Sequence, residues 1–445
     1  MKRPLLLWAL AVGVVVMAAS MGGLRTHPVS GCAYSTAPLT WEGPEDRAPY
    51  LKAMELAAYN LIAPGDPFFS FKNLEKGTRG ARSNASPEIP PVLLKAISWI
   101  ESVTTQASAE TPFEAVGPAL QSFDCGYGIM QVTSGMTTAL GESGQPSREQ
   151  ALVATHFAFN IARGAVILAE KWNAAPEQRP IAGTDTGGDP KILENWYFAL
   201  WSYNGFTGPG ANRSNHPLDP IYGSWPRTPY SCGPATDGFG HNRGNYPYQE
   251  LVIGCAEHPP VVKGKQLWQP QPISLPDLND PKWRDPLDLA NFRYPYNGMD
   301  IPSPQPVHRD SSSKPSGSEV EDLLGSPALR VNRPMIKVNY KPNQTAQAVE
   351  LTISNSGSGI LPWRITSTKT WVRLSATAGV ALGERVSCGD CERSQTIEVS
   401  VDPKRAPPGE TAVLRVENLV TGEKTEIALF LGTAYRIGAP GVTKN

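Results

Sequence analysis

Glu101 lies at the end of an apolar helical stripe, where a carboxylate is unusual. The segment 90–102 begins with two prolines and has apolar residues at 93, 96, 97 and 100, which predicts a helix with one buried face. Glu101 follows Ile97 by four residues and Leu94 by seven, so its side chain lies within about 40° of both around the helix. Such a carboxylate is either paired, or it is partly desolvated with its pKa raised toward the range of a general acid. The structural alternative is a helix-end glutamate whose carboxylate extends into water.

Two later segments carry polar side chains that suit a ligand site. Gly126 and Gly128 flank an aromatic residue, and glycines allow the backbone to approach another group closely. The apolar residues Ile129 and Met130 then precede Gln131, whose amide can both donate and accept hydrogen bonds with sugar hydroxyl and N-acetyl groups. Further along, the segment 203–205 (Tyr-Asn-Gly) predicts a helix end from which the tyrosine hydroxyl projects into a cleft.

Helices are expected to position these side chains. Amphipathic patterns predict helices at 45–63, 90–102, 151–172 and 192–203. Asn160 and Gly164 interrupt the third pattern at a four-residue step, and the glycine permits close helix packing. Most of the aromatic residues in 192–203 are interpreted as core. The sequence therefore predicts a mainly α domain around Glu101.

Four short motifs occur in one order within about 105 residues. They are Glu101-Ser102, Gly128-Ile129-Met130-Gln131, Asn160-Ile161-Ala162-Arg163-Gly164-Ala165 and Ala199-Leu200-Trp201-Ser202-Tyr203-Asn204-Gly205. Together they resemble the ordered motifs of the soluble lytic transglycosylase (SLT) family, which is related to goose-type lysozyme. The resemblance covers roughly residues 45–210, and Ser202 stands where the family usually has alanine. Ala58-Tyr59-Asn60 repeats part of the last motif, but it precedes Glu101 and is interpreted as unrelated.

The resemblance implies cleavage of the β-1,4 bond between N-acetylmuramic acid and N-acetylglucosamine in peptidoglycan. Glu101 would protonate the leaving oxygen and then accept the proton of the C6 hydroxyl of the same sugar, which closes a 1,6-anhydro ring. By the same resemblance, Tyr203 would be the second catalytic residue, and no metal or cofactor would be needed. The substrate-binding residues would be Ser102, Met130, Gln131, Asn204 and Asp124.

Two other functions fit the same residues. A goose-type hydrolase would need a second carboxylate about 6.5–9.5 Å from Glu101 to activate water, and Asp124 is the candidate nearest to the Gly-Tyr-Gly segment. Asp124 is, however, expected to hydrogen-bond the turn beside Cys125. The remaining alternative is a catalytically inactive wall-binding protein, against which the presence of both Glu101 and Tyr203 argues.

The whole-chain composition predicts several domains outside the cytoplasm. A chain of 445 residues exceeds the usual size of one core, and its 43 prolines and 41 glycines imply long loops and linkers. Lysine and arginine number 40 against 41 acidic residues, which excludes a general electrostatic attraction to nucleic acid. We expect a monomer whose partner is the glycan strand of peptidoglycan.

The N-terminus is typical of an exported protein. Lys2 and Arg3 precede an apolar run at 5–19, which predicts a signal peptide or a membrane anchor within residues 1–24. The segment 29–32 has the form of a lipoprotein box with Cys32 as acceptor, but polar residues separate it from the apolar run, so we favour the first two interpretations.

Six cysteines fit an oxidising compartment. Cys232 and Cys255 would close a loop of about 22 residues, contributing roughly 3 kcal/mol. The pair at 388 and 391 resembles a metal or redox motif but lacks a second ligand pair, so a small disulfide at a hairpin tip is favoured. Cys32 and Cys125 remain, either bonded to each other or with one of them modified.

The predicted domain organisation is a lysozyme-like transglycosylase domain followed by a linker and a β-domain. The first domain spans 45–258, with its core at 45–210 and an extension at 211–258 to which the motifs assign no role. A Pro/Ser-rich linker region covers 259–333. Period-two strands within 334–435, separated by turn residues, predict an immunoglobulin-like sandwich, which loosely resembles the BACON-type modules of bacterial extracellular enzymes.

Overall fold

The computed structural model describes residues 31–140, 144–174, 180–207, 214–233, 242–287, 300–339, 347–402, 404–407 and 409–432. The expected signal peptide or anchor at 1–24 lies outside these ranges. So do residues 433–435 of the expected sandwich and 288–299 of the expected linker.

The first part of the chain combines helices with short two-stranded sheets. Its longer helices are α1 (Ala48–Ala58), α2 (Pro91–Ser102), α3 (Arg148–Thr155), α4 (Phe157–Asn173), α6 (Tyr197–Tyr203) and α7 (Tyr248–Glu257). Its strands are β1 (Leu39–Glu42), β2 (Leu74–Thr78), β3 (Ala81–Ala85), β4 (Ala115–Pro118), β5 (Ile181–Ala182), β6 (Val261–Val262), β7 (Lys265–Gln266) and β8 (Asp300–Ile301). They pair as β1–β4, β2–β3, β5–β8 and β6–β7.

The prediction of a mainly α, lysozyme-like catalytic domain is wrong. Helices and strands each make up about 25% of the structure, and the strands are distributed over many sheets. The hairpin β2–β3 was not predicted, because only Leu74 of its residues is buried and the pattern shows no alternation. Strand β4 pairs with β1 far away in the sequence, so local periodicity could not indicate it.

The predicted helix at 151–172 is also divided in two. Helices α3 and α4 meet at His156, whose backbone is extended (φ −130°, ψ 113°), and their axes differ by 108°. The His156 ring accepts a hydrogen bond from the amide of Ala158 and so caps α4. No single helix among the described residues is long and apolar enough to span a membrane. The bent α3–α4 pair meets that requirement by length and composition, although most of its residues are buried in the core.

Two mainly antiparallel sheets form the C-terminal part. The first has the order β10 (Met335–Asn339), β17 (Lys424–Gly432), β16 (Thr411–Asn418), β12 (Ile360–Ser367), β14 (Ala378–Leu382), with β10 parallel to β17. The second has the order β13 (Val372–Leu374), β15 (Gln395–Val401), β11 (Val349–Asn355), β9 (Leu329–Val331). Apolar side chains of both sheets, including Leu351, Trp363, Leu414 and Ile427, form one core between them. These two sheets are the sandwich.

Strands β9, β12 and β14 of the sandwich were not predicted, and β12 and β14 contact the first part. Every residue of β14 is buried, and so are the first four of β12, because one face of this sheet edge covers the sandwich core while the other packs on α3 and β1. Strands buried on both faces lose the alternation that identifies a half-exposed strand. Ile360, Val380 and Leu382 accordingly belong to the same apolar cluster as the helices.

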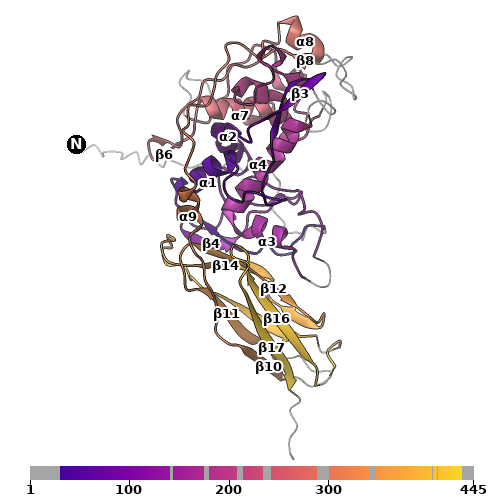
Figure 1. Ribbon diagram of the computed structural model, residues 1–445, viewed down its shortest axis with the longest axis vertical. Coiled ribbons are helices and arrows are strands. Elements are labelled where there is room, and N and C mark those ends of the chain that lie inside the picture. Colours follow the sequence, from indigo (N-terminus) through magenta and orange to yellow (C-terminus); the bar gives the residue numbers. More distant parts are fainter. Residues whose placement is uncertain are drawn as a thin grey trace, which may run out of the picture.

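Direct hydrogen bonds add to this interface. The Trp41 indole donates to the Ser387 carbonyl at 2.8 Å, and the Gln145 amide donates to the Ser367 carbonyl at 2.9 Å. Figure 1 shows the sandwich below the helical part, with α3 lying against β12 and β14. The sandwich is therefore a docked part of one body rather than a tethered module.

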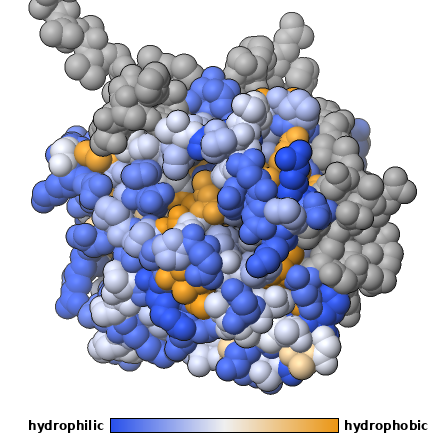
Figure 2. All heavy atoms as spheres, turned by 90° about the horizontal axis from the view of Figure 1, so that it is seen from above, coloured by the Kyte–Doolittle hydropathy of each residue, from blue (hydrophilic) through white to orange (hydrophobic). Residues whose placement is uncertain are grey.

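Much of the region at 259–333 packs on the first part. Trp268 and Trp283 are 6% and 2% exposed, and Ile301 is fully buried. Helix α8 (Pro281–Leu287) contains one of these tryptophans, and α9 (Ser318–Leu324) lies against α1. Seen from the end opposite the sandwich, the surface is mainly hydrophilic, with apolar residues visible in hollows between polar side chains (Figure 2).

All six cysteines pair. The disulfides are Cys32–Cys125, Cys232–Cys255 and Cys388–Cys391, with Cα–Cα distances of 5.3, 4.9 and 5.6 Å. The Cys32 sulfur is thus bonded to Cys125, which leaves no thiol there for a lipid. Three disulfides are typical of extracytoplasmic proteins.

Candidate active site

Glu101 lies in the last turn of α2. The apolar stripe before it is buried as the sequence predicted, with Leu94 and Ile97 fully buried and Ile100 5% exposed. The helix stops at Val103, which has a left-handed backbone (φ 56°) and whose amide bonds the carbonyls of Ser98 and Trp99. The partly buried Glu101 is therefore held at the boundary between core and surface by a well-defined helix end.

The surroundings of Glu101 raise its pKa to about 7. Desolvation by burial is the main cause, and the negative charge of Asp124 acts in the same direction. A hydrogen bond from Tyr248 and the positive charge of Arg243 act in the opposite direction. A carboxyl with this pKa can donate a proton near neutral pH and can also accept one.

Tyr248 is the group that contacts the Glu101 carboxylate directly. Its hydroxyl donates to Glu101 Oε1 at 2.5 Å, and burial together with the charge of Glu101 raises the pKa of Tyr248, so that it stays a donor. The Arg243 guanidinium donates to the Ile100 carbonyl at 2.7 Å, on the residue before Glu101. Both residues come from the extension at 211–258, to which the sequence motifs assigned no role. The signal that could have indicated Tyr248 is the apolar run at 251–256 in α7.

Several contacts fix α7 and hence Tyr248. The Cys232–Cys255 disulfide ties the helix to the preceding loop. Arg227 forms a buried ion pair with Glu250 of the helix. The side-chain amide of Gln249 donates to the Asn215 backbone carbonyl at 3.0 Å. The tyrosine is thus presented to Glu101 by a rigid element.

The turn at 126–131 is built around Met130 and the buried side chain of Asn160. Asn160 donates to the Tyr127 carbonyl at 2.7 Å and accepts from the Met130 amide at 2.9 Å. Gly164 lies one helical turn further along α4, and a Cβ there would come within 2.6 Å of Met130 Cγ. The motif at 160–165 therefore stabilises the turn at 128–131. Asn160 hydrogen-bonds the backbone of this turn, and Gly164 leaves space for the Met130 side chain.

Tyr203 bonds the same turn rather than Glu101. Its hydroxyl donates to the Met130 carbonyl at 2.9 Å. Burial, followed by the charge of Glu101, raises the pKa of Tyr203 well above its ordinary value, so the two side chains are near neighbours. The hydrogen bond of Tyr203 thus goes to the backbone of the turn and not to the Glu101 carboxylate.

The remaining predicted site residues have different surroundings. Ser102 donates to the Ile129 carbonyl at 2.8 Å and so ties α2 to the turn. The Gln131 amide donates to the Gly128 carbonyl at 2.9 Å. Asn204, at the exposed end of α6, accepts a hydrogen bond from Asn215. Asp124 is exposed and accepts a hydrogen bond from Ser122 at 2.6 Å.

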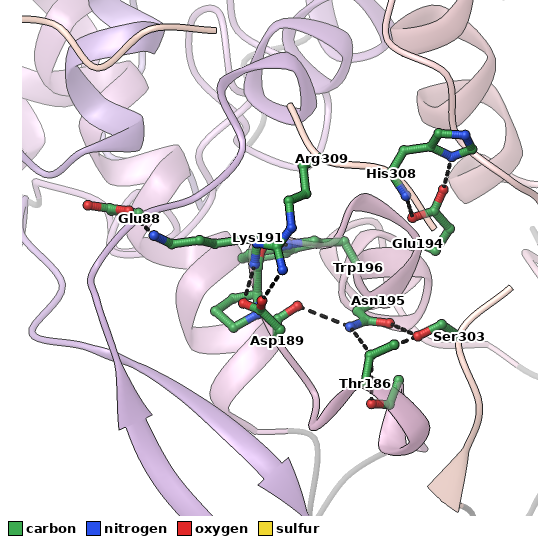
Figure 3. A network of polar contacts seen from close by, with 12 residues as sticks. Glu88, Thr186, Asp189, Lys191, Glu194, Asn195, Trp196, Ser303, His308 and Arg309 are labelled. Atoms are coloured by element: carbon green, nitrogen blue, oxygen red, sulfur yellow. Dashed lines mark hydrogen bonds and ion pairs between the residues drawn. The ribbon is translucent and has the colours of Figure 1, made fainter. Parts of the chain in front are cut away.

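A polar network holds the start of the helix that carries Tyr203. Glu194, fully buried just before α6, accepts hydrogen bonds from the backbone amides of Ser274 and His308 at 2.9 and 2.8 Å. Its neighbour Asn195 accepts one from Ser303 at 2.7 Å. Figure 3 shows these side chains joining α6 to the segment around His308. Part of the region expected as linker therefore braces the site.

Glu42 is a second buried carboxylate near this region. Its Oε2 accepts hydrogen bonds from the backbone amides of Gln106 and Ala107, each at 2.8 Å. Burial raises its pKa to about 7 despite those bonds. Because Gln106 in turn accepts a hydrogen bond from the Ile129 amide, Glu42 supports the loop that leads from Glu101 to the turn. Sequence reasoning did not identify it. Among the described residues, histidine, cysteine and acidic side chains form no group of three or more that could hold a metal ion.

Comparisons with known proteins add little to this geometry. The chain matches no protein-family model and no curated protein. One similar solved structure is the ASH/PapD-like domain 7 of human CEP192, with 12% identity over 24% of this chain and 87% of that one, and a TM-score of 0.18. Another is a protein of unknown function from Porphyromonas gingivalis W83, with 20% identity over 25% of this chain and 50% of that one, and a TM-score of 0.19.

Proposed function

We propose that this protein is an exported lytic transglycosylase that cleaves the β-1,4 bond between N-acetylmuramic acid and N-acetylglucosamine in peptidoglycan. The observation that carries the proposal is the Glu101 carboxyl, whose pKa is raised to about 7 while Tyr248 hydrogen-bonds it. The order of the four motifs, which resembles that of the SLT family, supports the same function.

One carboxyl serves both steps of the proposed reaction. Protonated Glu101 gives its proton to the glycosidic oxygen as the bond from that oxygen to C1 breaks. The resulting Glu101 carboxylate takes the proton of the C6 hydroxyl on the same sugar, and O6 bonds to C1. The acid is regenerated and no water is consumed. A pKa near 7 suits a group that must be acid first and base second.

Neighbouring residues stabilise the two states of Glu101. The Tyr248 hydroxyl donates to the carboxylate formed after the first step, and the Arg243 guanidinium adds a positive charge beside it. Tyr203 and Ser102 hold the turn at 126–131 through the carbonyls of Met130 and Ile129. These two residues act by positioning that turn, on which Gln131 would meet the sugar substituents.

Hydrolysis is the second candidate because of Asp124. Its charge contributes to the raised pKa of Glu101, so the two carboxyls are near one another, and its exposed position would let it activate water. The two reactions differ in product. Transglycosylation leaves a 1,6-anhydro end, whereas hydrolysis leaves a reducing end.

The three disulfides fit an extracytoplasmic protein. We place the protein at the cell wall, where the glycan strands of peptidoglycan are its partner.

Digestion of purified sacculi tests the proposal. The wild-type protein, Glu101→Gln and the matched exposed variant Glu110→Gln are incubated with sacculi, and the released muropeptides are weighed by mass spectrometry. Anhydro-muropeptides from wild type and Glu110→Gln, but not from Glu101→Gln, are expected. Reducing ends instead would indicate the hydrolase. An inactive wild type that still sediments with sacculi would overturn catalysis in favour of a wall-binding protein.

A further inference from the structure

The two residues that follow the helix of Glu101 have a strained backbone. Val103 and Thr104 both have left-handed dihedral angles, with φ of 56° and 53°. Both are β-branched, and such side chains rarely adopt a positive φ. Strain of this kind persists only where the surrounding structure holds it, and it is concentrated at functional sites. The direction in which the chain leaves Glu101 therefore depends on the contacts that hold these two residues.

Hydrogen bonds to α2 hold the strained pair from one side. The amide of Val103 donates to the Trp99 carbonyl at 3.0 Å, and the amide of Thr104 donates to the Ser98 carbonyl at 3.1 Å. The hydroxyls of Thr104 and Ser98 lie 2.9 Å apart and share a further hydrogen bond. These bonds attach the start of the loop at 103–107 to the helix.

Glu42 holds the other end of this loop. Its Oε2 accepts hydrogen bonds from the backbone amides of Gln106 and Ala107, each at 2.8 Å. Glu42 and Gln106 are 2% and 0% exposed, so water does not compete for these amides. Loss of the acceptor would leave two buried amides unpaired, which is costly. The carboxyl group of Glu42 therefore opposes any loop conformation in which the strain is released.

The strand that carries Glu42 is itself fixed. Strand β1 pairs with β4, and Glu42 lies opposite Ala115 in this pair. The neighbouring Trp41 is 4% exposed, and its indole donates to the Ser387 carbonyl of the sandwich at 2.8 Å. Glu42 is thus a fixed anchor that connects the docked sandwich to the loop that follows Glu101.

We propose that Glu42 is a positioning residue: by binding two backbone amides it holds the strained end of α2 in the orientation that brings the Glu101 carboxyl to Tyr248. This role rests on the function proposed above, since the orientation matters only where Glu101 transfers protons. Glu42 is buried and acts through the backbone. A displacement of about 1 Å near a reacting group can cost about 100-fold in rate. Removal of the Glu42 acceptor should therefore affect turnover more than substrate binding.

Replacement of Glu42 by methionine in the full-length protein tests this role, because methionine keeps the length of the side chain and is only a weak acceptor. Glu42→Gln keeps an oxygen that can accept both bonds. Glu42→Met with Val103→Gly removes the strain, since glycine adopts a positive φ readily. Glu417→Met is the matched control, because Glu417 is 9% exposed and lies on β16 of the sandwich. Turnover is measured as muropeptide release from soluble glycan strands, and circular dichroism verifies folding at the assay temperature.

We expect Glu42→Met to lower kcat by about tenfold or more and to change KM by less than about threefold, as for a misplaced reacting group. Glu42→Gln should keep most of the wild-type kcat. Adding Val103→Gly to Glu42→Met should restore kcat by about threefold or more, because the strain that Glu42 opposes is then absent. The control should match the wild type.

An unchanged kcat in Glu42→Met would overturn the role of Glu42. So would a Glu42→Gln variant as slow as Glu42→Met, or a loss of kcat that Val103→Gly does not relieve, since either result would indicate a general loss of structure. A wild type that releases no muropeptides would instead overturn the proposed function, and the role of Glu42 with it.

Discussion

Tyr248→Phe removes the one side-chain hydrogen bond made to the Glu101 carboxylate in the described structure, while keeping the aromatic ring. This bond favours the charged form of Glu101, and hydrogen bonds to charged groups contribute about 1.5–3 kcal/mol. Since about 1.4 kcal/mol corresponds to one pKa unit, we expect the pKa of Glu101 to rise from about 7 by about 1 to 2. The proposed first step needs protonated Glu101, so wild-type activity should fall as pH rises through about 7. In Tyr248→Phe this fall, the alkaline limb of the pH–activity profile, should lie at higher pH.

The same substitution should also slow the reaction. If roughly half of the carboxylate charge has developed in the transition state, about 0.75–1.5 kcal/mol of stabilisation is lost, which lowers kcat about 4- to 12-fold. The assay is the pH dependence of anhydro-muropeptide release. Tyr197→Phe is the matched control, because Tyr197 is equally buried at the α6–α7 contact and bonds Gln249 instead of Glu101. An alkaline limb that stays in place in Tyr248→Phe, or moves to lower pH, would refute the role assigned to this tyrosine.

Two further predictions concern the framework of the site. Gly164→Ala should lower the free energy of unfolding by about 1–3 kcal/mol, because the new Cβ would lie 2.6 Å from Met130 Cγ. The melting temperature and kcat/KM should both fall. An unchanged melting temperature would contradict the packing described. Replacing Cys32 and Cys125 by serine should cost about 4–5 kcal/mol, since that disulfide joins residues 93 apart. Replacing Cys388 and Cys391, only 3 apart, should cost about 2 kcal/mol; equal losses in the two denaturant titrations would count against the chain-entropy explanation.

Local pattern in the sequence was enough to place the central elements. The apolar spacing before Glu101 predicted α2 and its buried face, because a helix repeats every 3.6 residues whatever surrounds it. Alternating residues predicted β10, β11, β13, β15, β16 and β17 of the sandwich for the corresponding reason. Gly164 predicted the close packing of another helix, whereas the structure packs the Met130 side chain of the turn there.

Only the tertiary structure decided what surrounds those elements. Tyr248 reaches Glu101 from 147 positions away, and no local pattern can encode a contact between such distant side chains. Strand β14 lacks alternation because it is buried on both faces, and β1 is a strand only because β4 pairs with it. The mainly α prediction failed for the same reason, since helical periodicity is local while the pairing of short strands is not. The sequence thus predicted the helix that carries Glu101 and its buried face, and the fold determined which groups set the pKa of the Glu101 carboxyl.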